Sequence, residues 1–402
     1  MIQLEIPKKL QSVVTLARSV AAGYFRPISR KYDRAEHTYP KELDMLSAVM
    51  SGVQAAGAIQ GAGAASSRSR ERGEGGRRNG ANLATVLGLT ELSWGDIGLV
   101  LTMPGQGLGN AAIAAVATPA QKARFGDKWA AMAITEPEAG SDSAAIRTTA
   151  RLDGEEWVID GEKIYVTCGE RADAVVVWAS LDPSRGRAAI KSFVVEKGTP
   201  GMTVERLDKK MGIRASDTAV LRFDGCRIPK DNLLGDAEIQ PKRGFAGAMQ
   251  TFDNTRPMVA AMAVGVARAS LERAGEILAE RGVQVSYGGH PDAGSALEAD
   301  LVSMEAELEA ARLLMLKAAW MADDARPNSM EASMAKAKAA RVANAITLRC
   351  VELCGPAGYG EDELLEKWAR DSKILDIFEG TQQIQLLVVA RRLLGKRSSE
   401  LA

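Results

Sequence analysis

Cysteine and histidine are scarce in this chain, with 4 cysteines and 2 histidines among 402 residues. Cys168, Cys226, Cys350 and Cys354 match no spaced metal quartet, and they are too few for a disulfide scaffold. Cys350 and Cys354 stand at helical i,i+4 spacing, but no histidine or second cysteine pair lies nearby. This pattern favours buried thiols in one helix over two metal ligands. We therefore expect no metal site.

The chain also lacks an excess of either charge. Its 51 Lys and Arg residues balance 51 Asp and Glu residues, so no global field steers it toward nucleic acid or a bilayer. Any anionic ligand must be held locally. No apolar run approaches the roughly 20 residues that span a membrane, and the first residues are not a basic region followed by an apolar one. We expect a cytoplasmic protein with no membrane span that binds no nucleic acid.

The length exceeds that of one usual domain, and the patterning predicts helices, then strands, then helices again. Residues 1–127 show helical periodicity, with Leu43, Leu46, Val49 and Met50 on one apolar face. Within this first domain, residues 66–80 (SSRSRERGEGGRRNG) have no apolar anchor, which predicts a solvated or disordered loop.

Residues 128–236 contain short β-rich runs. Two of them, 156–159 and 163–167, flank Asp160-Gly161, a dipeptide that favours a hairpin turn. Further strands are predicted at 174–179, 190–195, 202–206 and 219–223. Together these strands predict a small β-barrel or sandwich.

Residues 237–402 return to helical patterning. Apolar residues at 301, 304, 308, 311, 315 and 318 follow three-four spacing, which predicts one seam of a four-helix bundle. The chain has no glycine-rich turn between a strand and a helix with Rossmann spacing, which argues against a nicotinamide-binding sheet. The predicted fold class is α+β, mainly α.

Several ordered motifs run through the second and third predicted domains. They are AITEPEAGSD at 133–142, DGEKIYVT at 160–167, MGIRAS at 211–216, FDGCRIPKDNLLG at 223–235, FDNTRP at 252–257, EKWARD at 366–371 and IFEGT at 377–381. In this order they resemble the acyl-CoA dehydrogenases, and the chain is similar to an actinobacterial branch of that family. The resemblance covers residues 125–395, whereas residues 1–124 match only in helical character and length.

The resemblance implies an FAD-dependent enzyme that oxidises the α,β carbon–carbon bond of an acyl-CoA thioester to a trans-2-enoyl-CoA. A carboxylate removes the α-proton while the β-hydrogen leaves as hydride to the flavin, which is the electron sink. The resemblance assigns the role of base to Glu379. Some relatives carry the base immediately before the arginine of the FDNTRP motif, but Thr255 stands there and cannot accept the proton. The plainer alternative for Glu379 is an acidic residue at a helix cap.

Two physical effects act on Glu379 in opposite directions. An unperturbed glutamate, with a pKa of about 4.3, is a poor base toward carbon, and burial would raise that pKa. Thr381 is predicted to be the N-cap of a helix, whose dipole would favour the anion. The N–H groups there could also polarise a thioester oxygen. The sequence leaves open which effect dominates.

The resemblance also implies binding residues. Those expected at FAD are Ile134, Thr135, Ser141, Tyr165, Val166, Thr167, Arg281, Gly355, Thr381 and Gln383. Those expected at the substrate are Ser141, Asp253, Arg256 and Gly380. Each has a plainer interpretation: Thr135 and Ser141 as turn caps, Tyr165 and Thr167 as strand formers, and the Asp253 and Arg256 pair as a structural ion pair.

Two segments depart from the family pattern. ELCGPAG at 352–358 stands where the family usually has a Gln-x-x-Gly-Gly-x-Gly segment against the neighbouring subunit's FAD pyrophosphate. Glu352 would bring negative charge toward that diphosphate, and Pro356 removes a backbone donor. RGVQVSYGGH at 281–290 keeps Arg281 but has a longer following loop. Both departures fall on parts that serve the partner subunit, so we expect a homo- or hetero-oligomer.

Alternative functions stay open. An electron-transferring flavoprotein is the expected electron acceptor, but an acyl-CoA oxidase or nitroalkane oxidase could use the same scaffold. The nitroalkane branch uses an aspartate base, whereas this chain has Glu379. A partner-dependent or non-catalytic subunit of a heteromeric enzyme would explain Glu352 and Pro356. Nucleic-acid binding has only the arginines of 66–80 in its favour.

Overall fold

The protein is described from a computed structural model that defines residues 6–47, 80–105, 107–239, 246–283, 285, 287, 294–396 and 400, without the side chains of 246–254. The predicted loop at 66–80 therefore lies outside the described residues except for Gly80. Of the predicted apolar face, Leu43 and Leu46 are buried, whereas Val49 and Met50 also lie outside them. In the described part of the chain, no helix is both long enough and apolar enough to cross a membrane.

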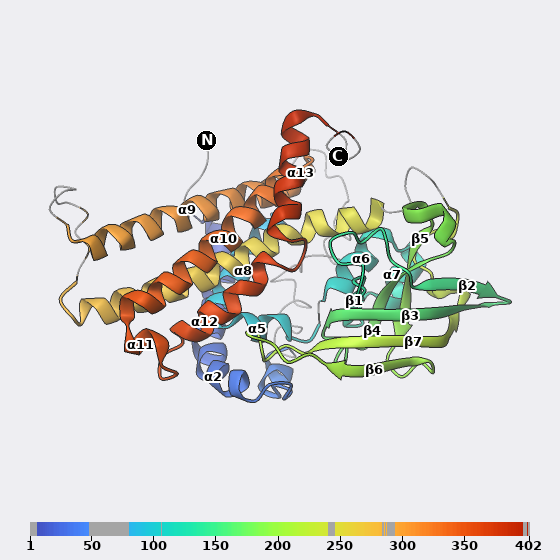
Figure 1. Ribbon diagram of the computed structural model, residues 1–402, viewed down its shortest axis with the longest axis horizontal. Helices are drawn as coiled ribbons and strands as arrows, with labels where there is room; N and C mark the ends of the chain where they lie inside the picture. Colours follow the sequence, from blue (N-terminus) through green and yellow to red (C-terminus); the bar gives the residue numbers. More distant parts are fainter. Residues whose placement is uncertain are drawn as a thin grey trace.

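The chain begins with a series of helices, the last of which lie beside the strands (Figure 1). They are α1 (Lys8–Val20), η1 (Ala21–Phe25), α2 (Arg26–Arg34), α4 (Ala81–Gly95), α5 (Ile97–Leu101), α6 (Leu108–Val116) and α7 (Pro119–Phe125). Asp96 caps α5, because its carboxylate accepts a hydrogen bond from the Leu99 backbone N–H at 2.8 Å. Thr118 and Gln121 form a capping box at the start of α7.

The strands follow and lie together at one end of the molecule (Figure 1). They are β1 (Ala130–Ala133), β2 (Thr149–Asp153), β3 (Glu156–Thr167), β4 (Ala174–Ser180), β5 (Ile190–Glu196), β6 (Met202–Leu207) and β7 (Thr218–Pro229). Within the described residues they form one seven-stranded sheet in the order β1-β4-β2-β3-β7-β6, with β5 paired to β4. The strands predicted at 174–179, 190–195, 202–206 and 219–223 are confirmed.

The predicted hairpin at Asp160-Gly161 is wrong. These residues lie within the continuous strand β3, where the pairing with β7 shifts register between Ile159 and Gly161. Gly161 is needed at this bulge, because a Cβ there would stand 2.4 Å from the Thr148 hydroxyl oxygen. The hairpin forms instead between β2 and β3, which pair antiparallel up to Asp153 and Glu156, and Gly154 in its turn has φ 65°.

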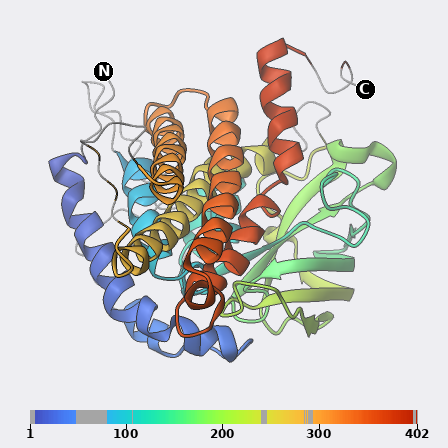
Figure 2. The ribbon, with the colours of Figure 1, turned by 60° about the vertical axis from the view of Figure 1, so that its left-hand side comes forward.

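Long helices return after the sheet and pack lengthwise against one another (Figures 1 and 2). The long ones are α8 (Ala246–Ala279), α9 (Ala296–Asp323) and α10 (Ser329–Cys354), followed by α11 (Pro356–Tyr359), α12 (Leu365–Ser372), η6 (Lys373–Asp376) and α13 (Gln382–Leu394). The predicted seam on α9 is confirmed, because Leu301, Met304, Ala311, Met315 and Ala318 are buried and Leu308 packs against their cluster. The α+β, mainly helical class is also confirmed.

A buried ion network joins all three parts of the chain. Lys367 on α12 lies between two carboxylates, with Nζ 2.7 Å from Asp96 Oδ2 and 2.5 Å from Asp371 Oδ2. Asp371 also accepts a hydrogen bond from the Ile213 backbone N–H, in the loop between β6 and β7. Burial disfavours a charged Lys367, but the two carboxylates outweigh it and raise its pKa.

We predict that Lys367→Met lowers the free energy of unfolding by about 3–5 kcal/mol, because Asp96 and Asp371 would stay buried without their cation. Urea denaturation followed by circular dichroism measures the change. Lys31→Met is the control, since Lys31 is exposed and pairs with Glu42 at 2.7 Å, and an exposed pair contributes only about 0–1 kcal/mol. A Lys367→Met protein as stable as this control would contradict the role of the network.

Candidate active site

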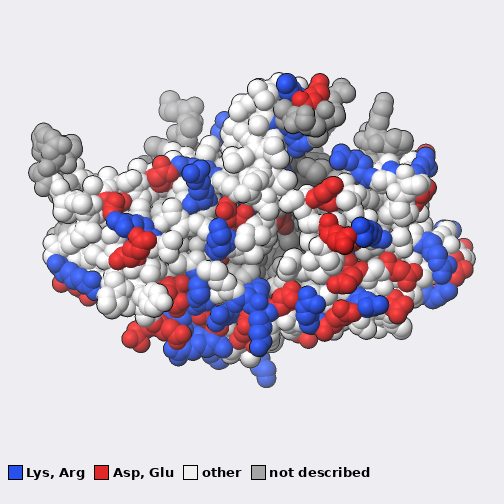
Figure 3. Space-filling model, in the orientation of Figure 1, with Lys and Arg blue, Asp and Glu red and all other residues white. Residues whose placement is uncertain are grey.

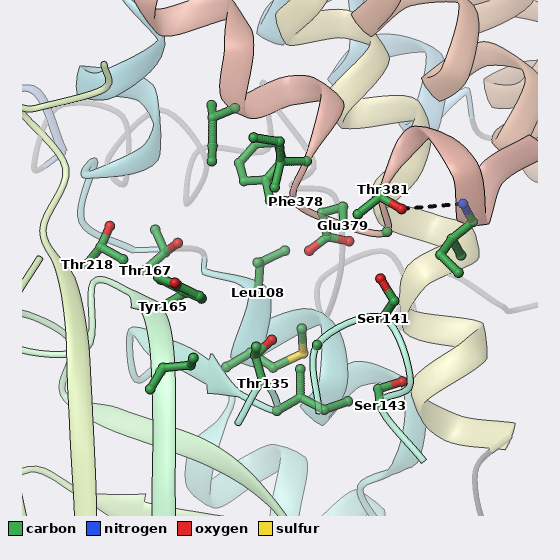
Figure 4. Close-up of a pocket in the computed structure, with 18 of the residues that line it drawn as sticks. Leu108, Thr135, Ser141, Ser143, Tyr165, Thr167, Thr218, Phe378, Glu379 and Thr381 are labelled. Carbon is green, nitrogen blue, oxygen red and sulfur yellow. Dashed lines mark hydrogen bonds between the residues drawn. The ribbon is translucent and has the colours of Figure 1, made fainter. Parts of the chain in front are cut away.

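A cavity of about 1290 Å³ opens between the sheet and the C-terminal helices. Thr135, Ser141, Tyr165 and Thr167 line it from the strand side, and Glu379 lines it from the opposite wall (Figure 4). Drug-sized ligands occupy about 300–1,000 Å³, so this cavity has room for a substrate and a large cofactor together. It is therefore the candidate site.

A buried ion pair shapes the loop on the strand side of the cavity. Lys163 on β3 has its Nζ 2.7 Å from Glu136 Oε1, and the same Nζ donates to the Ile134 carbonyl at 3.1 Å. The Glu136 carboxylate also accepts hydrogen bonds from the backbone N–H groups of Arg147 and Thr148, at 2.6 and 3.0 Å. One carboxylate thus joins both ends of the loop that presents Thr135 and Ser141 to the cavity.

Burial and charge act in opposite directions on this pair. Burial lowers the pKa of Lys163 to about 8, and the nearby Glu136 carboxylate only partly offsets it. Burial opposes ionisation of Glu136 as well, but the Lys163 charge and the hydrogen bonds outweigh it and hold the Glu136 pKa below its usual value. Neither residue was predicted as part of the site, although Glu136 lies in the AITEPEAGSD motif and Lys163 in the DGEKIYVT motif.

Tyr165 presents an aromatic ring to the cavity from a backbone irregularity. It has φ 57° and lies where the β3–β7 pairing shifts register between Lys163 and Val166. Its side chain is 64% exposed and lines the cavity, as does Thr167, whereas Val166 between them is buried in the sheet core. An exposed ring flanked by hydroxyl groups suits a planar heteroaromatic cofactor.

Glu379 lies in the short turn between η6 and α13 and borders the cavity, half-buried. The Thr255 hydroxyl donates a hydrogen bond to its Oε2 at 2.6 Å. Burial raises the pKa of Glu379, while the Thr255 hydrogen bond and the charges of Arg256 and Lys336 oppose that rise. Thr381 caps α13 as predicted, with its hydroxyl accepting from the Ile384 N–H at 3.4 Å. For the pKa of Glu379, burial outweighs the Thr255 hydrogen bond and the charges of Arg256 and Lys336.

Comparisons with known proteins identify the family of this chain. Residues 131–226 match the family model of the acyl-CoA dehydrogenase middle domain, and residues 242–394 match that of the C-terminal domain. The short-chain specific acyl-CoA dehydrogenase of Clostridium acetobutylicum is 37% identical over 268 residues, which are 67% of this chain and 69% of that protein. The chain belongs to the acyl-CoA dehydrogenase family.

Two further relatives show how far the likeness extends. The mitochondrial short-chain specific acyl-CoA dehydrogenase of Mus musculus is 42% identical over 269 residues, which are 67% of this chain but only 64% of that protein. The structure of butyryl-CoA dehydrogenase from Megasphaera elsdenii superposes with a TM-score of 0.83 and 31% identity, covering 98% of this chain and 100% of that one. Acyl-CoA dehydrogenases are FAD-dependent, and the hydroxyl-lined cavity with its exposed Tyr165 ring fits that cofactor.

The structure brings most of the predicted site residues to this cavity. Those that line it are Ile134, Thr135, Ser141, Tyr165, Thr167, Arg256, Glu379, Gly380 and Thr381. Arg256 is buried, and its Nη1 donates to the Ser333 hydroxyl at 3.4 Å. Val166 and Gln383 are not among the described residues that line the cavity. The side chain of Asp253 lies outside the described part of the structure.

Arg281 and Gly355 lie together at the other end of the long helices. Arg281 follows α8 and donates to the Cys354 carbonyl at 3.3 Å, and Gly355 stands between α10 and α11 (Figure 1). Neither is among the described residues that line the cavity. Glu352 is not left as a lone anion here, because Arg349 pairs with it at 2.6 Å. Pro356 is the first residue of α11, a position where a missing N–H costs no helical hydrogen bond.

Basic residues around the cavity were not predicted from the sequence. Besides Arg256, the lining cations are Arg187, Lys209, Lys210, Arg370, Lys373 and Arg391, against the anions Asp142, Asp208 and Glu379. On the face shown in Figure 3, by contrast, basic and acidic side chains are intermixed. A net-neutral protein can thus still offer a locally basic site to anionic ligands. The run of Asp208, Lys209 and Lys210 before the MGIRAS motif was the available signal.

We predict that Lys163→Met lowers the amount of FAD bound per chain and the free energy of unfolding, the latter by about 3–5 kcal/mol, because Glu136 loses its buried cation. Flavin absorbance per chain and urea denaturation measure the two effects. Lys230→Met is the matched control, since Lys230 is 51% exposed and lies 3.7 Å from Glu155. Full FAD occupancy in Lys163→Met would contradict the role of the pair in holding the loop.

Proposed function

We propose that this protein is an FAD-dependent acyl-CoA dehydrogenase in which Glu379 removes the α-proton of the thioester and trans-2-enoyl-CoA is the product. One observation carries the proposal: the carboxylate with a raised pKa, Glu379, stands across the cavity from the Tyr165 ring and the hydroxyls of Thr135 and Thr167. A base on one wall and a cofactor surface on the other would hold the substrate between them.

The chemistry of Glu379 follows from its surroundings. A carboxylate is a better base toward carbon when burial raises its pKa, yet it must lose its own proton near neutral pH to act. The Thr255 hydroxyl and the charges of Arg256 and Lys336 favour the ionised form and limit the rise. FAD, when bound, accepts the hydride that leaves the β-carbon.

The turn that carries Glu379 would also activate the thioester carbonyl. Gly380 and Thr381 directly precede α13, so their N–H groups stand at the positive end of a helix dipole. Such donors stabilise negative charge that develops on a carbonyl oxygen. Gly380, together with Ser141, Asp253 and Arg256, is proposed to contact the acyl-CoA. Short-chain thioesters are the first to test, because two of the relatives are named short-chain specific.

The residues that we propose to contact FAD form two groups. Ile134, Thr135, Ser141, Tyr165, Val166, Thr167, Thr381 and Gln383 are proposed to serve the FAD of their own chain. Arg281 and Gly355, at the far end of the helices, are proposed to serve the FAD of a second subunit.

Apolar surface on α13 supports an oligomer. The helix projects from the bundle (Figures 1 and 2), and Leu386, Leu393 and Leu394 on it are 50%, 65% and 62% exposed. Exposed leucines gathered on one projecting element favour burial against a partner. An electron-transferring flavoprotein is the proposed electron acceptor, and the cytoplasmic location stays a prediction.

A partner-dependent subunit is the second candidate. Glu352 and Pro356 favour it, because they change the segment that in this family faces the FAD pyrophosphate of a neighbour. The Arg349 pair at Glu352 weakens that argument by offsetting the charge. An acyl-CoA oxidase is a further alternative, and it differs in reacting rapidly with oxygen once its flavin is reduced.

We predict that a short-chain acyl-CoA bleaches the flavin of the wild-type protein under anaerobic conditions, and that Glu379→Gln at equal FAD occupancy does not. The substitution preserves shape and removes the base. Absorbance in a stopped-flow spectrophotometer measures the bleaching. Glu361→Gln is the control, because Glu361 is exposed and paired with Arg34.

Two results would count against the proposal. A protein that binds no FAD alone, or whose flavin no thioester bleaches, would favour the partner-dependent subunit. Bleaching that survives in Glu379→Gln would mean that another group removes the proton.

A further inference from the structure

The turn that carries Glu379 has an unusual backbone. Glu379 has φ 57° and Gly380 has φ 88°, so two consecutive residues adopt the left-handed region. A residue with a side chain adopts this region at a cost in strain, and such a conformation persists only where its surroundings fix it. Something must therefore hold this turn in place.

Lys336 is one of the groups that hold it. It lies on α10, its side chain is fully buried, and its Nζ donates a hydrogen bond to the Gly380 carbonyl at 2.7 Å. Burial lowers the pKa of Lys336 to about 8, with Asp376 and Glu379 opposing that effect. A buried amine is costly, and an apolar residue of the same length would fill this space at lower cost. Packing alone does not explain a lysine at this position.

Gln385 is the second group. It lies in the first turns of α13 with its side chain fully buried. Its Nε2 donates to the carbonyls of both Glu379 and Gly380, at 3.0 and 3.1 Å. Gly380 has φ 88°, where a side chain would be strained, and a Cβ there would stand 2.4 Å from that nitrogen, so a larger residue would displace the Gln385 amide. Two buried donors thus fix the two carbonyls of the turn.

The charged groups around the Glu379 carboxylate come from neighbouring elements. Arg256 on α8 and Lys336 on α10 favour its ionised form, and the Thr255 hydroxyl on α8 donates to it. Asp376 on η6 faces Lys336. Lys336 also bonds to the backbone of the turn, so it acts on both the position of the carboxylate and its electrostatic surroundings.

We propose that Lys336 is a positioning residue for the base: its ammonium group holds the Glu379–Gly380 turn through the Gly380 carbonyl and acts electrostatically on the Glu379 carboxylate. This inference rests on the proposed function of Glu379. It makes two separable claims, one about geometry and one about charge.

The test uses a reaction that needs the base but no hydride transfer. A 3-thia-acyl-CoA has sulfur in place of the β-carbon, so it cannot lose a β-hydride, while its α-protons still exchange with D₂O through a base. Mass spectrometry follows that exchange over a range of pH in the FAD-loaded wild-type protein and in Lys336→Met. FAD per chain and the melting temperature are measured for each variant.

We expect Lys336→Met to exchange about 10- to 100-fold more slowly at neutral pH, because a small displacement of a catalytic group is enough for a loss of that size. The rate rises with pH as Glu379 loses its proton, and the Lys336 charge lowers the pKa of Glu379. Removing that charge should therefore move the rising part of the profile to higher pH. If Lys336 had a purely structural role, the substitution would change the melting temperature but would not shift the pH dependence of the exchange rate.

Lys338→Met is the matched control on the same helix, because Lys338 is 32% exposed and pairs with Glu307. It should keep the wild-type profile. Lys336→Gln is the second variant in case Lys336→Met does not fold. It retains an N–H donor without the charge, so its rate should recover in part while the profile stays shifted.

A wild-type rate and profile in FAD-loaded Lys336→Met would overturn the inference, as would an unshifted profile in Lys336→Gln. If the wild-type protein itself shows no exchange, while Glu379→Gln and wild type behave alike, the proposed function fails instead. The two failures are thus distinguishable.

Discussion

The buried network of Asp96, Lys367 and Asp371 is the interaction on which the site depends, because the cavity lies between elements from different parts of the chain. Lys367 and Asp371 belong to α12, Asp96 caps α5, and the Ile213 N–H that bonds to Asp371 belongs to the loop between β6 and β7. The neighbouring Gly212 packs so closely that a Cβ would stand 2.5 Å from the Arg370 carbonyl oxygen. The two walls of the cavity are therefore fixed relative to one another.

The same arrangement occurs on each wall of the cavity: a buried lysine donates a hydrogen bond to a backbone carbonyl and interacts with a carboxylate. On the strand wall Lys163 bonds the Ile134 carbonyl and pairs with Glu136. On the helix wall Lys336 bonds the Gly380 carbonyl and acts electrostatically on Glu379. The difference lies in the carboxylate. The Lys163 charge and several hydrogen bonds lower the pKa of Glu136, whereas burial raises the pKa of Glu379, which makes it the better proton acceptor.

Local sequence patterns predicted helices well where a single buried face or a single capping residue determines the helix. The three-four spacing on α9 and the Thr381 cap are such cases, and both are observed. The Asp160-Gly161 hairpin was wrong because the same dipeptide also suits a bulge inside a strand, and the choice depends on the contact with Thr148 from a neighbouring segment. The domain boundaries at 127 and 236 stay predictions.

The sequence motifs predicted which residues line the cavity. They did not predict the residues that hold those lining residues in position. Thr255 was set aside as a base from its residue type, but its hydrogen bond to Glu379 joins residues 124 positions apart, which no local pattern reveals. Lys336 gave no signal either, because a lysine in an alanine-rich helix suggests an exposed face until the packing is known. The predicted role of Arg281 and Gly355 concerns the FAD of a neighbouring subunit, so the fold of one chain does not test it.

The most direct test of the central claim is the rate of flavin reduction with butyryl-CoA carrying deuterium at the α-carbon or at the β-carbon. Removal of a proton by Glu379 and departure of a hydride predict that either label slows the reduction, because both carbon–hydrogen bonds break. Equal rates for unlabelled and both labelled substrates, under conditions where bleaching itself is measured, would contradict the account.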